Sequence, residues 1–192
     1  MGPAMTMIWQ FGAIVLAPLA STADYNAPSF AQTEVHVSAD SELRFGTFMV
    51  FGRGARTVGV NGTVTDESIV ALEGTVPGPA QFTVIYDRGN ESGNSGRQTR
   101  DIEIEIYISP SQRVRDGGVE GALSNLTTDL PGALRVTEGQ PVRISIPNCR
   151  TRTCSRTFKV GATLNVDRTY GGASLAIPIP VDAVLISDDR QR

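Results

Sequence analysis

The most restrictive feature of the chain is an alternating run over residues 101–108, Asp-Ile-Glu-Ile-Glu-Ile-Tyr-Ile. Its four isoleucines lie two positions apart, and side chains with that spacing share one face only in an extended strand. The polar residues between them indicate a second face that meets water. Burial of four isoleucines contributes roughly 6–12 kcal/mol at most, and ordering eight residues costs about as much or more. The strand therefore needs neighbouring strands or a facing sheet, which predicts an all-β protein.

Short strand-like segments separated by turn residues follow one another along most of the chain. Turns such as Asn61-Gly62, Pro77-Gly78-Pro79 and Gly171-Gly172 carry residues that favour or permit turn geometry. Beyond the N-terminal part, no segment of a dozen residues has helical periodicity, so few helices are expected. This rhythm is typical of a β-sandwich. We expect strands over residues 33–37, 43–45, 56–64, 68–74, 80–86, 101–108, 121–126, 133–137, 141–146, 155–166 and 174–187.

The N-terminal part differs from the rest. Residues 8–20 form an apolar run of signal-peptide length that is too short to cross a bilayer as a helix. A positively charged start is missing, since no Lys or Arg precedes Arg44, and a buried N-terminal helix is the alternative interpretation. We expect an export signal, because the sequence that follows is all-β.

We expect residues 1–31 to be the signal peptide and residues 32–192 to form a single β-sandwich domain. Cleavage after Ala31 suits a small last residue, and Ala20 and Ala23 are earlier alternatives. The mature protein is then expected in the periplasm, at the cell surface or outside the cell. No later apolar run is long enough to span a membrane. The 17 basic and 20 acidic residues give a net charge of −3, which argues against nucleic acid as a partner.

Two cysteines flank a short turn between strand-like segments. Cys149 and Cys154 are separated by four residues, which predicts a disulfide across the end of a hairpin in an exported protein. By loop-closure entropy a ring this small contributes only about 2 kcal/mol, so it pins the turn and does not hold the fold together. A zinc site would need two more ligands, and the sole histidine, His36, is distant in sequence. No metal or cofactor is expected.

Positive charge gathers around this turn, which suggests a binding surface for an anionic glycan. No aromatic residue is interleaved to stack on sugars, and hairpin tips are commonly charged, so a solvated turn is the simpler interpretation. The candidate binding residues are Arg150, Arg152, Arg156 and Lys159.

Residues 87–100 are rich in Gly, Asn and Ser and are expected to form a loop. Asp87, Asn90 and Glu91 are candidate calcium ligands, but their spacing does not match the regular calcium-binding loop. A solvated linker is the simpler interpretation.

No catalytic residues are expected. His36 lies in an alternating segment, residues 33–37, which indicates a surface position on a strand, and no G-x-S-x-G elbow or phosphate-binding glycine loop accompanies it. Glu103 and Glu105 resemble the paired carboxylates of a glycosidase, but the alternation explains them as the wet face of the isoleucine strand. We therefore expect a protein that is not an enzyme.

Three segments resemble a known family. Residues 43–47 (Leu-Arg-Phe-Gly-Thr), 79–84 (Pro-Ala-Gln-Phe-Thr-Val) and 158–166 (Phe-Lys-Val-Gly-Ala-Thr-Leu-Asn-Val) are similar, in order and spacing, to anchor segments of the secreted bacterial domain of unknown function family 4402. The resemblance implies an Ig-like or pilin-like antiparallel β-sandwich exported by Gram-negative bacteria, without catalytic residues. On this basis we expect a fimbrial-like or coat-subunit-like structural or adhesion protein that contacts copies of itself or other surface proteins. A binding module for an anionic glycan is the alternative.

Two features bear on how such subunits associate. Pro178 and Pro180 remove two N–H donors from one side of the expected final strand, so that side is expected to be a sheet edge. If subunits join by lending a strand, the extended leader over residues 24–37 is the expected donor.

Overall fold

The structure is a computed structural model that describes residues 33–89, 98–109, 113–116, 119–137, 139–168 and 170–190, with the backbone alone at residues 167, 168, 170 and 171. This part of the chain is built of strands and turns without a helix, which confirms the all-β prediction. The expected signal peptide and the candidate calcium ligands Asn90 and Glu91 lie outside the described residues. None of the described residues belongs to a helix long and apolar enough to cross a membrane.

The strands form two antiparallel sheets. The larger sheet has the order β1-β4-β9-β2-β10, with β3 on β2, β7 on β9 and β6 on β7. The smaller sheet has the order β11-β5-β8. The strands are β1 (Glu34–Ser41), β2 (Leu43–Val58), β3 (Val64–Ala71), β4 (Ala80–Asp87), β5 (Arg100–Ile108), β6 (Val114–Asp116), β7 (Val119–Thr128), β8 (Val142–Cys149), β9 (Thr153–Arg168), β10 (Tyr170–Ile177) and β11 (Val181–Arg190).

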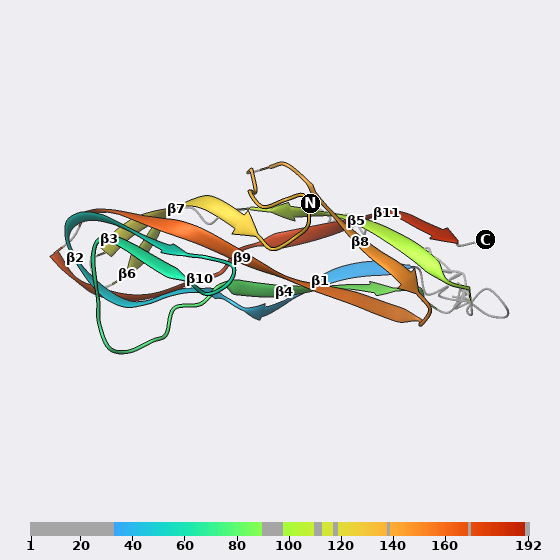
Figure 1. Ribbon diagram of the computed structural model, residues 1–192, viewed down its shortest axis with the longest axis horizontal. Coiled ribbons are helices and arrows are strands. Elements are labelled where there is room, and N and C mark those ends of the chain that lie inside the picture. Colours follow the sequence, from blue (N-terminus) through green and yellow to red (C-terminus); the bar gives the residue numbers. More distant parts are fainter. Residues whose placement is uncertain are drawn as a thin grey trace, which may run out of the picture.

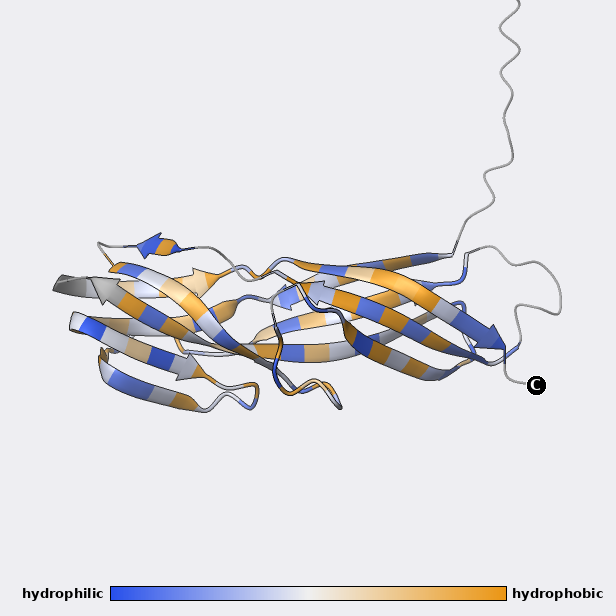
Figure 2. Cartoon of the chain, turned by 90° about the horizontal axis from the view of Figure 1, so that it is seen from above, coloured by the Kyte–Doolittle hydropathy of each residue, from blue (hydrophilic) through white to orange (hydrophobic). Residues whose placement is uncertain are grey.

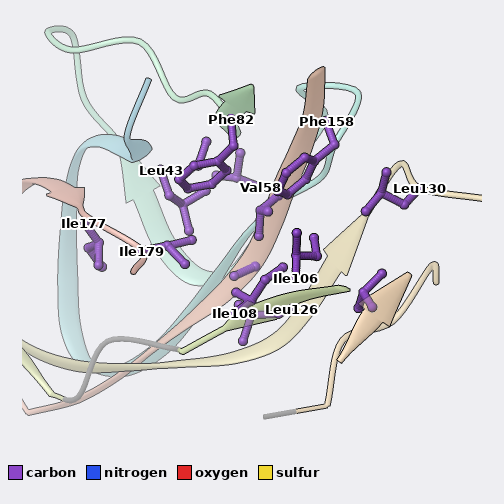
Figure 3. Packing of buried hydrophobic residues seen from close by; sticks show 14 of the residues in the cluster. Leu43, Val58, Phe82, Ile106, Ile108, Leu126, Leu130, Phe158, Ile177 and Ile179 are labelled. Carbon is purple, nitrogen blue, oxygen red and sulfur yellow. The ribbon is translucent and has the colours of Figure 1, made fainter. Parts of the chain in front are cut away.

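The two sheets pack as an elongated sandwich (Figure 1). Apolar and polar residues alternate along many of the strands, and this alternation separates a core face from a solvent face (Figure 2). Phe82 of β4 and Phe158 of β9 stack with ring centroids 5.4 Å apart. Across the core from them lie Ile106 and Ile108 of β5 (Figure 3). The predicted β-sandwich is therefore the observed architecture.

The isoleucine strand is β5, the central strand of the smaller sheet. All four isoleucines are at most 1% exposed, whereas Glu103 is exposed. The strand pairs with β11 on one edge and with β8 on the other. It therefore has both the neighbouring strands and the facing sheet that its apolar face requires.

The long strand β2 changes pairing partners along its length within the larger sheet. Its residues 43–51 pair with β10 and its residues 54–58 pair with β9, and the strand curls back between them (Figure 1). Gly52 has φ +104°, and an added Cβ at Gly54 would lie 2.8 Å from Cγ1 of Ile69. Both positions need glycine, the first for its backbone conformation and the second for the close approach of β3.

This curl corrects the expectation of separate strands over residues 43–45 and 56–64. The Gly-Arg-Gly sequence bends a single strand and does not end it. The turn back into β3 comes later, at residues 59–63, where Gly62 has φ +81°.

The C-terminal part of the chain also differs from the prediction of one strand over residues 174–187. It forms β10 in the larger sheet and β11 in the smaller one, and residues 178–180 connect them. Pro178 and Pro180 lie between strands, so the prediction that they remove donors from within the final strand is wrong, although β10 and β11 are edge strands of their sheets as expected. Ile179, between the prolines, is 5% exposed and packs in the core. Proline is tolerated at these positions because the segment between the two sheets is not part of a ladder, so the backbone N–H that proline lacks is not needed there.

Three smaller features also differ from the sequence prediction. Residues 133–137 form a loop with one bridge, between Arg135 and Thr127, and not a strand. The short strand β6 was not foreseen, because its three residues have no alternating apolar pattern. The leader proposed as a donor strand, residues 24–37, already contributes Glu34–Val37 to β1, which pairs with β4 of the same chain.

Candidate functional site

The predicted disulfide is present at the end of the β8–β9 hairpin. The Cys149 and Cys154 sulfur atoms are 2.01 Å apart, and the two Cα atoms are 6.0 Å apart. The Thr151 hydroxyl donates to the Thr153 carbonyl over 2.7 Å and tightens the turn. We call the end of the molecule formed by residues 149–154 the disulfide tip.

The four candidate binding residues do not converge on one surface. The Arg152 guanidinium donates through Nε to Asp87 over 3.0 Å, and Arg156 donates through Nη1 to the Ser145 carbonyl over 2.5 Å. The Arg150 side chain is exposed, whereas the backbone N–H of Lys159 donates to Asp129 over 2.8 Å. The binding of an anionic glycan by these residues stays a prediction, and two of the four guanidinium or ammonium groups already have partners.

The ion pair between Arg152 and Asp87 changes the pKa of Asp87, which is one of the candidate calcium ligands. The Arg152 hydrogen bond, followed by the backbone N–H of Gly89, holds the pKa of Asp87 below its usual value of 3.8. The Gly89 N–H donates to the Asp87 carboxylate over 2.8 Å. In this arrangement Asp87 accepts bonds from the protein and connects the start of the loop to the β8–β9 turn.

A buried polar cluster lies beneath the disulfide tip. The Tyr86 hydroxyl donates to Asp188 over 2.9 Å, and the Arg100 guanidinium pairs with the same carboxylate. Tyr86 is fully buried and Arg100 is 3% exposed. Burial, and then the bond to Asp188, raises the pKa of Tyr86. The cluster joins β4 in one sheet to β5 and β11 in the other.

A second buried arginine contacts the disulfide tip. Arg88 is 2% exposed and donates through Nη2 to the carbonyl oxygens of Cys149 and Gln98, each at 3.2 Å. Sequence reasoning missed both arginines. A signal was present, because Arg100 has the same parity as the buried isoleucines of β5 and so points into the core.

A third buried arginine has a structural role. Arg56 of β2 donates to Asp66 of β3 through Nε at 2.5 Å and Nη2 at 2.8 Å, and to the Phe45 carbonyl at 2.8 Å. Its guanidinium also lies 5.2 Å from the centre of the Phe48 ring. These contacts satisfy the buried charge and fasten the curled part of β2 to β3.

The residues considered for catalysis lie on solvent faces. His36 is exposed on β1, as its alternating segment predicted. Glu105 accepts a bond from Arg143 Nε at 3.1 Å and one from the Tyr107 hydroxyl at 3.3 Å, while Glu103 is exposed on the same face of β5. Within the described ranges, no three His, Cys, Asp or Glu residues are grouped so as to hold a metal ion.

The outer face of β2 and β3 carries an unusual group of apolar side chains. Val70 of β3 is the pairing partner of Met49 of β2. Phe51 lies two residues after Met49 on β2, and Leu72 lies just beyond the end of β3. Phe51 is 71% exposed, Val70 50% and Leu72 39%. Gly172 of β10, the partner of Met49 on the other side, leaves this face flat. We call Met49, Phe51, Val70 and Leu72 the outer apolar patch.

Sequence reasoning did not find the outer apolar patch. Apolar residues at positions 48–51 are consecutive, and a consecutive run does not show which side chains face outward. The core face of this part of β2 is already supplied by Phe48 and Val50, both fully buried. The patch therefore adds nothing to the core.

Comparison with known proteins supports the resemblance found in the sequence. Residues 35–182 match the family described as Domain of unknown function (DUF4402). No curated protein and no solved structure shows a significant match to the chain. Since the match covers most of the sequence and the fold is the sandwich that the resemblance implies, the chain belongs to the DUF4402 family.

Proposed function

We propose that this protein is an exported, non-enzymatic surface protein of the structural or adhesion type, similar to a fimbrial or coat subunit, which acts through contacts with other proteins. The observation that carries the proposal is the outer apolar patch. Contiguous exposed apolar surface is uncommon on monomeric soluble proteins, and where it occurs it commonly marks an interaction site. Three of the four side chains of the patch are at least 39% exposed.

The position of the outer apolar patch suits such a role. β1 starts at the disulfide tip, since Glu34 pairs with Asp87, and β11 ends there, since Arg190 pairs with Arg100. The patch lies toward the other end of the long axis, beside the curl of β2 (Figure 1). The two strand ends and the patch are therefore separated along the molecule, and a contact at the patch leaves the disulfide tip unobstructed.

The structure of the patch also suits protein contacts better than binding of a small molecule. It is a sheet face crossed by three strands and not a cavity, and a flat apolar face is typical of the centre of a protein interface. Phe51 is its most exposed member and the expected anchor of the contact, because aromatic side chains dominate interface energies.

The proposal is tested by chemical cross-linking on intact cells and by sedimentation of the purified protein. The double variant Phe51→Ser with Val70→Thr is expected to lose the cross-linked species, because it removes the centre of the patch. The matched control is Leu134→Ser, which removes an equally exposed residue, also 71% exposed, outside the patch. Loss of the cross-links in both variants, or in neither, would contradict a contact at the patch. Absence of the protein from the cell surface would contradict the proposed location.

A further inference from the structure

A polar groove of about 320 Å³ lies between the loop after β7 and the start of β8. The loop forms one wall and the first residues of β8 form the other. Its volume is at the lower end of the range for small-molecule sites and matches a ligand the size of one sugar ring. The residues that matter for its chemistry are Pro131, Arg135, Thr137, Gln140, Pro141 and Arg143.

The loop wall is held in place by buried hydrogen bonds. Thr128 is 1% exposed, and its hydroxyl donates to the Ala133 carbonyl over 2.6 Å. The N–H of Leu130 donates to the same hydroxyl over 3.3 Å, and the N–H of Val136 donates to the Leu126 carbonyl over 2.9 Å. Leu130 is 2% exposed and anchors the loop in the core. The groove is therefore preformed, which lowers the entropy lost when a ligand binds.

The groove brings together positive charges that are distant in sequence. Arg135 comes from the loop and Arg143 from β8. Arg143 is 72% exposed and uses Nε for Glu105, so its terminal nitrogens have no protein partner among the described residues. Arg135 has no side-chain partner within that same part of the chain. Arg156 of β9 adds a third guanidinium nearby, at the Ser145 carbonyl, two residues along β8 from Arg143.

We propose that this groove binds the carboxylate of an acidic saccharide, with a hexuronate as the recognised unit. Arg135 and Arg143 supply the planar donors that match a carboxylate. The side chains of Thr137 and Gln140 can donate hydrogen bonds to sugar hydroxyls and accept hydrogen bonds from them. Pro131 and Pro141 stiffen the two rims. This inference goes beyond the proposed function, which concerns a different surface, and it does not depend on it.

The test measures binding of linear trigalacturonate to the purified protein by isothermal titration calorimetry. The wild type is expected to bind trigalacturonate, and its fully methyl-esterified form, which has no negative charge, is expected not to bind. Arg135→Gln and Arg143→Gln are each expected to weaken binding at least tenfold. The matched control is Arg113→Gln, a 77% exposed arginine just before β6 and outside the groove, which is expected to leave binding unchanged. A further variant, Arg150→Gln, tests the disulfide tip.

Each contrary outcome identifies a different error. Absence of binding to the wild type, or unchanged binding in Arg135→Gln, would overturn the site. An equal loss in Arg150→Gln would place the ligand at the disulfide tip instead. Equal competition by sodium acetate or by triglutamate at the same concentration would overturn the saccharide as the ligand, because it would show recognition of a carboxylate alone. Unchanged thermal unfolding of the variants checks that a loss of binding is not a loss of fold.

Discussion

The hydroxyl of Tyr86 donates to the carboxylate of Asp188 over 2.9 Å and joins the fourth strand to the last one across the two sheets. Arg100 pairs with the same carboxylate, so three side chains from three strands share one partly buried contact. This contact closes the core at the disulfide tip with polar groups where the isoleucine face of β5 ends. Its energy depends on the protonation of Tyr86, which makes it accessible to experiment.

Tyr86→Phe is expected to lower the free energy of unfolding by about 1–2 kcal/mol, because it removes one hydrogen bond to a charged acceptor and keeps the ring. The pKa of Tyr86 is raised in the folded protein above its usual value of 10.0, so the folded state holds this proton more tightly than the unfolded state does. The contribution of this raised pKa to the free energy of unfolding is fully present below about pH 10 and is lost as the pH rises through the pKa of Tyr86 in the folded protein. Urea unfolding between pH 8 and pH 11 measures both effects.

The control for this pH dependence is Tyr107→Phe. Tyr107 also has a raised pKa, caused by burial and then by the Glu105 charge, but it lies on the solvent face of β5. The Tyr107→Phe variant is therefore expected to lose stability at alkaline pH almost as much as the wild type does. If Tyr86→Phe and Tyr107→Phe flatten the pH profile equally, the buried contact is not its source.

Substitutions at neighbouring positions of β5 are expected to have opposite outcomes. Ile104→Glu places a carboxylate in the core at a residue that is 0% exposed, and the chain is expected not to fold. Glu103→Lys changes an exposed side chain and is expected to shift the free energy of unfolding by less than about 0.5 kcal/mol. Circular dichroism and urea unfolding of both variants test the alternation. Similar effects of the two substitutions on folding would refute it.

Gly54→Ala is expected to destabilise the protein by about 1–3 kcal/mol, because the new methyl group would lie 2.8 Å from Ile69 Cγ1 and 2.9 Å from the Glu67 carbonyl oxygen. The comparison is Ala55→Gly, one residue further along the same strand, which creates no clash and is expected to cost about 1 kcal/mol at most. Thermal unfolding measures both. A neutral Gly54→Ala would show that β2 and β3 do not approach so closely at the curl.

Reduction of the disulfide is expected to lower the free energy of unfolding by only about 2 kcal/mol, because its ring closes a short segment. Cys154→Ser is the preferred variant, since Cys149 is 2% exposed and its carbonyl accepts a bond from Arg88. Thiol labelling of the folded, non-reduced protein checks that the bond forms. Labelled cysteines in that experiment would contradict a stable disulfide.

The local parts of this fold were predictable from the sequence. The alternation in residues 101–108 correctly placed the buried and exposed faces of β5, because a strand has a period of two whatever its partners are. The disulfide was predictable for a similar reason, since its two cysteines are close in sequence and flank one turn.

The prediction failed where a residue type is compatible with two different local structures. The sequence predicts separate strands over residues 43–45 and 56–64, but Gly52 and Gly54 bend the single strand β2. The sequence predicts that Pro178 and Pro180 lie within the final strand, but they lie in the connection between β10 and β11. Glycine permits a bend as well as a turn, and proline marks a crossover as well as an edge.

The sequence by itself determined that the chain is all-β and which face of β5 is buried. Only the tertiary structure decided that β2 changes partners and that Tyr86, Arg100 and Asp188 meet. It also decided that Arg135 and Arg143 line one groove. The physical reason is the range of the interactions. Side-chain alternation is a property of neighbouring residues, whereas strand pairing joins residues as distant in sequence as Leu43 and Ile177, whose proximity exists only after the sheets have formed and packed.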